Sequence, residues 1–140
     1  IEWEQIILSN SNKDIFKALL KNIENIAIVG ASSNPERDSF RVMKYLLEQG
    51  YKIFPVNPKE SYILGRKCYP SLTLIEERVD MVDIFRAKEF IFDITKEAIN
   101  INASIIWMQE GIIHKESSSL AKSNGLKVIM DECPKKVLEA

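Results

Sequence analysis

The stretch IVGASSNPERDSFR, residues 28–41, decides the fold of this 140-residue chain. It starts in an apolar run, turns at Gly30, continues through small residues and enters a helix near Ser39. A helix that begins after a buried strand directs its positive N-terminal end at the turn, where phosphate groups bind in many proteins. The turn holds one glycine, whereas the dinucleotide-binding fingerprint holds three. The stretch therefore predicts a strand–turn–helix unit and leaves nucleotide binding open.

Apolar runs of the same kind recur along the chain, and they are short, nearly continuous and rich in Ile and Val. They occupy residues 26–29, 53–56, 81–85, 105–108 and 128–130. Such runs are typical of parallel strands that are buried on both faces. Helical patterns are found at residues 14–22, 42–49, 90–101 and 114–125, and a short extra strand is expected at residues 67–69.

Strands that alternate with helices at this spacing predict a Rossmann-like α/β fold. We expect a doubly wound, mainly parallel sheet of five to six strands in a three-layer αβα arrangement. No repeat or linker interrupts the pattern, so the prediction is a single domain over residues 1–140, in which residues 1–24 form an N-terminal helical extension.

The composition argues against several classes of function. A net charge of −1 gives no electrostatic reason to expect binding to nucleic acid or to an anionic membrane. No apolar run approaches the roughly 20 residues that span a bilayer, and the acidic, polar N-terminus is unlike a signal peptide. One histidine and two cysteines outside any CxxC pair predict neither a disulfide scaffold nor a metal site. We expect a cytoplasmic protein.

The expected topology also locates a binding site. In open α/β sheets, ligands bind beyond the carboxyl ends of the strands, where the strand order reverses. Five segments follow the expected strands, and their polar groups should converge on one cleft: residues 30–39, 57–61, 85–89, 109–114 and 131–136.

The second of these segments discriminates between nucleotides. NAD-binding domains place an acidic residue after the second strand, where it binds the ribose hydroxyls. Here Asn57 and Lys59 come first and Glu60 follows late. A lysine at this point suits a ribose that carries a further phosphate, as in NADP or coenzyme A (CoA), and Arg37 and Arg41 have guanidinium groups suited to phosphate oxygens. NAD is disfavoured.

Four motifs in this order carry a resemblance to a known family: VGAS, PVNPK, LG-KCYPSL and VD-VD-F. Residues 26–72 resemble the CoA-binding domain family, and residues 79–86, 105–112 and 126–135 continue the match. The chain looks most like the small stand-alone bacterial and archaeal members. It is also similar to the N-terminal domain of the succinyl-CoA synthetase alpha subunit and to ADP-forming acyl-CoA ligases.

The resemblance implies that CoA lies across the carboxyl ends of the sheet. Carried over by position, Gly30, Ala31 and Ser32 would receive the pyrophosphate, with Arg37 or Ser39 nearby.

For the rest of the ligand, the same resemblance assigns Asn57, Pro58 and Lys59 to the adenosine end, where Lys59 would meet a phosphate. Phe85 and Arg86 would flank the nucleotide from the third major strand.

The remaining chemistry-bearing residues give little support for catalysis. Gln109 would lie towards the pantetheine arm of CoA, and Cys133, close to two lysines, is a possible redox thiol that could form a mixed disulfide with CoA. His114 is expected at a helix start rather than as a base, and Cys68 is expected to be structural. Asp83 is expected to be a structural hydrogen-bonding group within the sheet.

These residues favour a protein that binds CoA or an acyl-CoA and has no catalytic activity of its own. The family's synthetases use a phosphorylated histidine on a second domain and a nucleotide-grasping partner. This chain has neither room for that domain nor the glycine-rich motif around such a histidine. Two alternatives stay open. One is an NADP-binding, oxidoreductase-like domain, and the other is a CoA-binding subunit of a split acyl-CoA ligase whose partner is separately encoded. The sequence leaves the oligomeric state open.

Overall fold

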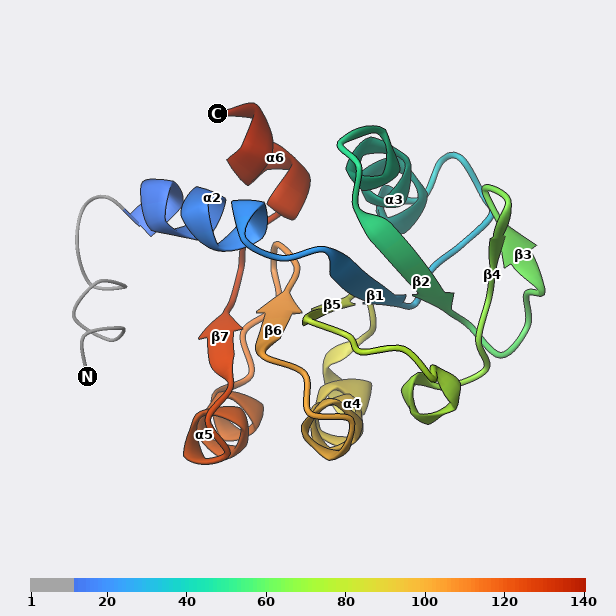
Figure 1. Cartoon of the computed structure of the whole chain (residues 1–140). Helices are drawn as coiled ribbons and strands as arrows, with labels where there is room; N and C mark the ends of the chain where they lie inside the picture. Colours follow the sequence, from blue (N-terminus) through green and yellow to red (C-terminus); the bar gives the residue numbers. More distant parts are fainter. Residues whose placement is uncertain (1–11) are drawn as a thin grey trace.

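The computed structural model describes residues 12–140, which fold around one five-stranded parallel sheet (Figure 1). The strand order is β2-β1-β5-β6-β7. The strands are β1 (Asn25–Val29), β2 (Lys52–Val56), β5 (Met81–Ile84), β6 (Ile105–Met108) and β7 (Lys127–Ile129). The order reverses between β1 and β5, as in a doubly wound sheet, and the Rossmann-like prediction is confirmed.

Helices cover both faces of the sheet (Figure 1). On one face lie α2 (Asn12–Lys21), α3 (Asp38–Glu48) and α6 (Pro134–Glu139), and on the other lie α4 (Lys88–Asn100), α5 (Lys115–Ser123) and the short helix η1 (Leu72–Leu74). Alternate strand residues enter two separate apolar cores, so that Ala27 packs with α4 and α5 whereas Ile28 packs with α2 and α3. Burial on both faces is the reason why the strands are apolar throughout.

The central strand β5 carries a carboxyl group inside one of these cores. Asp83 pairs in register with Ile28 of β1 and Trp107 of β6, and it is 0% exposed. Neither of its carboxylate oxygens has a hydrogen-bond partner among the described residues. Burial raises its pKa well above the usual value for an aspartate. The expectation that Asp83 is a hydrogen-bonding group is therefore wrong.

The short extra strand differs from its prediction. Instead of residues 67–69, β4 comprises Arg66–Lys67 and pairs antiparallel with β3 (Tyr62–Ile63) in a separate two-stranded hairpin. The chain then runs along β2, where the Tyr69 N–H donates to the Pro55 carbonyl at 2.9 Å and the Asn57 N–H donates to the Tyr69 carbonyl at 2.9 Å. These bonds place the hairpin against the outer edge of the main sheet.

The two ends of the described chain meet on one face of the sheet. Helix α2 confirms the amphipathic helix predicted at residues 14–22, and it packs against α6. Helix α6, which the sequence analysis did not predict, begins with Pro134 directly after its N-cap Cys133. No helix within residues 12–140 has the length and apolar character needed to cross a membrane. Residues 1–11 of the predicted N-terminal extension lie outside the described residues.

Candidate nucleotide-binding site

A cavity of about 710 Å³ opens at the carboxyl ends of β1, β2, β5 and β6. It extends across the point between β1 and β5 where the strand order reverses. The eleven residues that the resemblance assigns to the ligand all line it: Gly30, Ala31, Ser32, Arg37, Ser39, Asn57, Pro58, Lys59, Phe85, Arg86 and Gln109. Its volume lies within the range of about 300–1,000 Å³ that is usual for small-molecule sites.

One of the five predicted segments does not take part. Residues 131–136 are absent from the described lining of the cavity, whereas the other four segments all contribute to it. The reason is topological, because β7 is the edge strand farthest from the reversal point and the chain turns from it directly into α6.

The first loop approaches the end of β5 closely. Gly30 has a φ of +88°, and a Cβ atom placed there would lie 2.4 Å from the Phe85 carbonyl oxygen and 3.0 Å from Cδ of Arg86. Only glycine fits this position without strain, since it combines a left-handed backbone with a contact that leaves no room for a side chain.

The backbone N–H groups of Gly30, Ala31 and Ser32, which were expected to receive the pyrophosphate, are not all free. The N–H groups of Gly30 and Ala31 both donate to the Val56 carbonyl, at 3.0 and 3.4 Å, and so extend the ladder between β1 and β2. Beside the N-terminus of α3, the cavity-lining residues whose N–H groups have no acceptor within the described chain are Ser32, Asp38 and Ser39. On this side of the cavity, the backbone donors available to an anion are therefore Ser32 and the first turn of α3.

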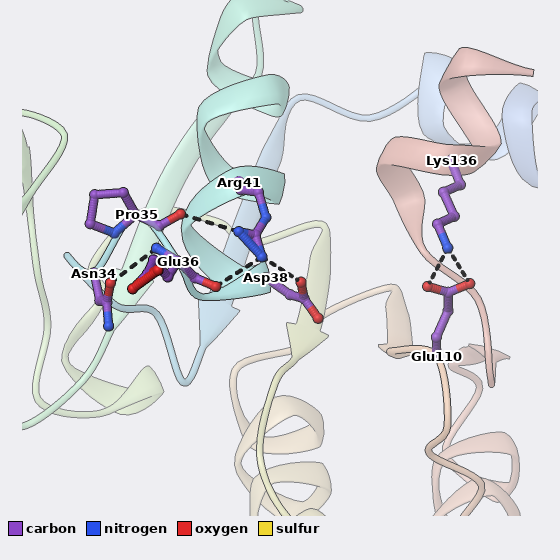
Figure 2. Close-up of polar contacts among 7 residues, drawn as sticks. All are labelled: Asn34, Pro35, Glu36, Asp38, Arg41, Glu110 and Lys136. Carbon is purple, nitrogen blue, oxygen red and sulfur yellow. Dashed lines mark hydrogen bonds and ion pairs between the residues drawn. The ribbon is translucent and has the colours of Figure 1, made fainter.

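Arg41 supports this loop from behind. Figure 2 shows its guanidinium group donating to the carbonyl oxygens of Pro35 and Glu36, at 3.3 and 2.8 Å, and to the Asp38 carboxylate at 3.3 Å. The Asn34 side chain accepts from the Glu36 N–H at 3.0 Å. Arg41 therefore stabilises the entry into α3 and does not line the cavity, although the sequence suggested that it would bind phosphate.

Three cationic side chains do line the cavity. Arg37 and Lys59 are exposed, and neither side chain has a carboxylate partner among residues 12–140. The guanidinium group of Arg86 lies over the ring of Phe90 at 4.0 Å, a stacked cation–π contact. These groups leave positive charge available on the side of the cavity formed by α3, β2 and β5.

Asn57 connects two of the loops. Its side-chain Nδ2 donates to the Ala31 carbonyl at 2.8 Å, and its Oδ1 accepts from the Lys59 N–H at 2.8 Å. The contact holds Lys59 beside the first loop, so Asn57 acts as a structural link between the loops that follow β1 and β2.

The opposite wall is formed by the loop after β6. Gln109 is 7% exposed, and its Oε1 atom has no hydrogen-bond partner among the described residues. The next residue, Glu110, forms an ion pair with Lys136 of α6, in which Nζ lies 2.9 and 3.0 Å from the two carboxylate oxygens (Figure 2). This wall therefore offers a buried acceptor to the N–H or O–H of a ligand.

The sequence argument missed five lining residues: Glu36, Asp38, Val56, Glu110 and Ile112. Three of them are carboxylates, and they were missed because only cations were sought for a phosphate ligand. Arg41 holds Asp38 and Lys136 holds Glu110, which neutralises much of their charge. Their position in the sequence could have identified these two carboxylates as lining residues, since Asp38 lies within the first loop and Glu110 follows Gln109.

The thiol and imidazole groups lie away from the cavity lining. Cys133 is 6% exposed at the start of α6, and the nearby Lys135 and Lys136 are paired with Glu139 and Glu110. Its redox role stays a prediction. His114 caps α5, as expected, and its Nδ1 accepts from the Ser117 N–H at 3.1 Å. No three His, Cys, Asp or Glu side chains of the described chain come together as a metal site.

Comparisons with known proteins agree with this geometry. The model of a family described as CoA binding domain matches residues 24–139. The uncharacterised protein YneT of Bacillus subtilis is 36% identical over 91% of this chain and 95% of its own length. The alpha subunit of the ADP-forming acetate–CoA ligase II of Pyrococcus furiosus is 39% identical over 50% of this chain, but the match spans 16% of that subunit.

Among solved structures, a hypothetical protein from Pyrococcus horikoshii superposes with a TM-score of 0.88 at 38% identity. The superposition covers 91% of this chain and 89% of that one. The similarity thus extends over 89% of the Pyrococcus horikoshii protein but over 16% of the ligase subunit. The chain belongs to the CoA binding domain family.

Proposed function

We propose that the protein binds CoA or an acyl-CoA in the cavity and catalyses no reaction on its own. The observation that carries the proposal is the set of unused donors along one side of the cavity. Three backbone N–H groups, at Ser32, Asp38 and Ser39, have no acceptor, and Arg37 and Lys59 have no carboxylate partner among the described residues. Donors left unsatisfied beside a helix N-terminus favour a polyphosphate ligand.

In the proposed arrangement, the pyrophosphate lies between Ser32 and the start of α3, with Arg37 beside it. Lys59 meets the ribose phosphate, at the position where an NAD-binding domain has an acidic residue. The adenosine lies near Phe85 and Arg86.

The pantetheine arm runs along the opposite wall. It carries amide N–H groups, and the unpartnered Oε1 of Gln109 is an acceptor of the kind that such groups need. This assignment gives the buried Gln109 side chain a partner that the described protein residues do not supply.

Thermal unfolding in the presence of CoA, acetyl-CoA, NADP and NAD tests the proposal. At a ligand concentration 100 times the dissociation constant, binding stabilises the folded state by about 2.7 kcal/mol. For a domain of this size the midpoint should rise by on the order of 10 °C. We expect that rise with CoA or acetyl-CoA and not with NAD. A shift with NADP alone would instead support the oxidoreductase-like alternative, and no shift with any ligand would contradict nucleotide binding.

Replacing Lys59 by methionine tests the proposed phosphate contact. Methionine keeps most of the apolar stem and removes the charge, so CoA should bind about fivefold more weakly, as expected for one exposed ion pair. The affinity for dephospho-CoA, which lacks the ribose phosphate, should not change. Titration calorimetry measures both affinities. Lys44→Met is the matched control, since Lys44 is an exposed lysine of α3 outside the cavity lining. An equal loss for both ligands would contradict the assignment.

A second candidate function is that of a CoA-binding subunit in a two-subunit ligase. The similarity to the Pyrococcus furiosus ligase subunit favours it, although the match spans 16% of that protein. Purification of the tagged protein from its native cells would discriminate between the two. Recovery of a ligase subunit in equal amounts supports the second candidate, whereas the protein recovered alone and able to bind CoA supports the first.

A further inference from the structure

Glu60 is the acidic residue of the segment that follows β2, residues 57–61, and its side chain does not line the cavity. It is half-buried, and its Oε2 atom accepts a hydrogen bond from the Ser33 N–H at 2.7 Å. A carboxylate after the second strand receives ribose hydroxyls in NAD-binding domains. Here the carboxylate is bonded to the backbone of the neighbouring loop instead.

Among the described residues, this bond is one of two hydrogen bonds that join the loop at residues 30–39 to the segment at residues 57–61. The other is the bond from Asn57 Nδ2 to the Ala31 carbonyl, at 2.8 Å. The two contacts hold Ala31 and Ser33, the residues on either side of Ser32. Ser32 lines the cavity, and its N–H group has no acceptor among the described residues. The free donor is therefore fixed from both sides.

We propose that Glu60 is a positioning residue, which holds the first loop so that the Ser32 N–H is ordered for an anion before the ligand binds. The inference rests on the proposed function, since it assigns the anion to the phosphates of CoA. Ordering a loop costs conformational entropy, and a loop that is already ordered spares the ligand that cost. Glu60 thus strengthens the binding of a negatively charged ligand although it carries a negative charge itself.

The direction in which a substitution of Glu60 changes the affinity for CoA therefore tests the proposal. If Glu60 acted only through its charge, removing the charge would strengthen the binding of an anion. If it acts by holding the loop, Glu60→Ala weakens binding because the Ser33 N–H loses its acceptor. Glu60→Gln removes the charge but keeps an acceptor oxygen, so it should retain binding. Alanine is therefore expected to weaken binding, whereas glutamine is not.

Titration calorimetry with CoA on the full chain measures these effects. We expect Glu60→Ala to bind about tenfold more weakly than wild type, as for the loss of one charge-assisted hydrogen bond. Glu60→Gln should bind at least as tightly as wild type. Glu48→Ala is the matched control, since Glu48 is an exposed glutamate at the far end of α3 and outside the cavity lining, and it should leave the affinity unchanged.

Hydrogen exchange of the Ser33 amide in the ligand-free protein is the second measurement. It should accelerate in Glu60→Ala and stay near the wild-type rate in Glu60→Gln. Wild-type affinity in Glu60→Ala, equal weakness in both variants, or unchanged Ser33 exchange in Glu60→Ala would overturn the role of Glu60. A wild-type protein that does not bind CoA would overturn the proposed function, and the exchange rates would then still decide whether Glu60 orders the loop.

Discussion

Replacing Gly30 by alanine is expected to lower the free energy of unfolding by about 3 kcal/mol and to abolish ligand binding. Two costs add at this position. The φ of +88° is a left-handed conformation that costs a non-glycine residue roughly 1–2 kcal/mol. The added Cβ would also lie 2.4 Å from the Phe85 carbonyl oxygen, which is backbone and cannot rotate away. The first loop must then move away from β5, and the cavity wall moves with it.

Gly125→Ala is the matched control for this prediction. Gly125 has a φ of +83°, and a Cβ there would have nothing within 4 Å. It should show the backbone cost alone, about 1–2 kcal/mol, and should leave binding unchanged. Urea unfolding and calorimetry with CoA measure the two effects. Equal losses of stability in the two variants would contradict the close approach between Gly30 and Phe85.

Replacing Asp83 is expected to remove a large pH dependence of stability. Burial raises the pKa of Asp83 well above its usual value, so the folded state holds this proton more tightly than the unfolded state does. The stabilisation is therefore fully present below the unfolded pKa of about 3.9 and is lost as the pH rises through the folded pKa. Between the two pKa values, the loss is up to about 1.4 kcal/mol per pH unit.

Asp83→Asn keeps the shape of the side chain and removes the titration, so its stability should vary less with pH than that of the wild type. Asp83→Val removes the unpartnered polar atoms as well, and it should raise the free energy of unfolding by about 1–3 kcal/mol at neutral pH. Urea unfolding at a series of pH values measures both. Asp93→Asn, at an exposed carboxyl group of α4, is the control for the loss of one acidic residue. If the free energy of unfolding of Asp83→Asn varied with pH as steeply as that of the wild type, Asp83 would not be the group responsible for the pH dependence.

The neighbouring Asp80 has the opposite character, although it lies only three residues away. Burial raises its pKa, but hydrogen bonds from the N–H groups of Asn25 and Glu24 and from Arg78 outweigh burial and lower it overall. The pKa values of two aspartates of one short motif are thus shifted in opposite directions, because Asp80 has hydrogen-bond donors and Asp83 has none among the described residues.

The fold was predictable because its strands are buried on both faces. That burial makes the apolar runs continuous. Their spacing along the chain was enough to predict the alternation of strands and helices. The hairpin β3–β4 was misplaced and helix α6 was missed, because elements this short show no periodic pattern. Each strand of the hairpin has two residues, and α6 has six. Contacts with β2, α2 and α3 determine their positions instead.

The residues of the candidate site were predictable as a group, because topology brings the carboxyl ends of parallel strands together. Their individual orientations were not. Arg37 and Arg41 are both arginines at the start of α3, yet one lines the cavity and the other bonds to the carbonyl oxygens of the loop. The sequence also could not reveal that the N–H groups of Gly30 and Ala31 are taken by Val56, since that depends on how far the β1–β2 ladder extends.

The segment that follows the β3–β4 hairpin has a consequence for association between chains. An exposed edge strand is a template on which another chain can add a strand, and it is a common start of aggregation. Along β2, the Tyr69 N–H donates to the Pro55 carbonyl, and the Arg66 side chain donates to the Ile53 carbonyl at 3.3 Å. Pro55 itself has no N–H to donate. The chain thereby closes this side of its own sheet to intermolecular β-pairing.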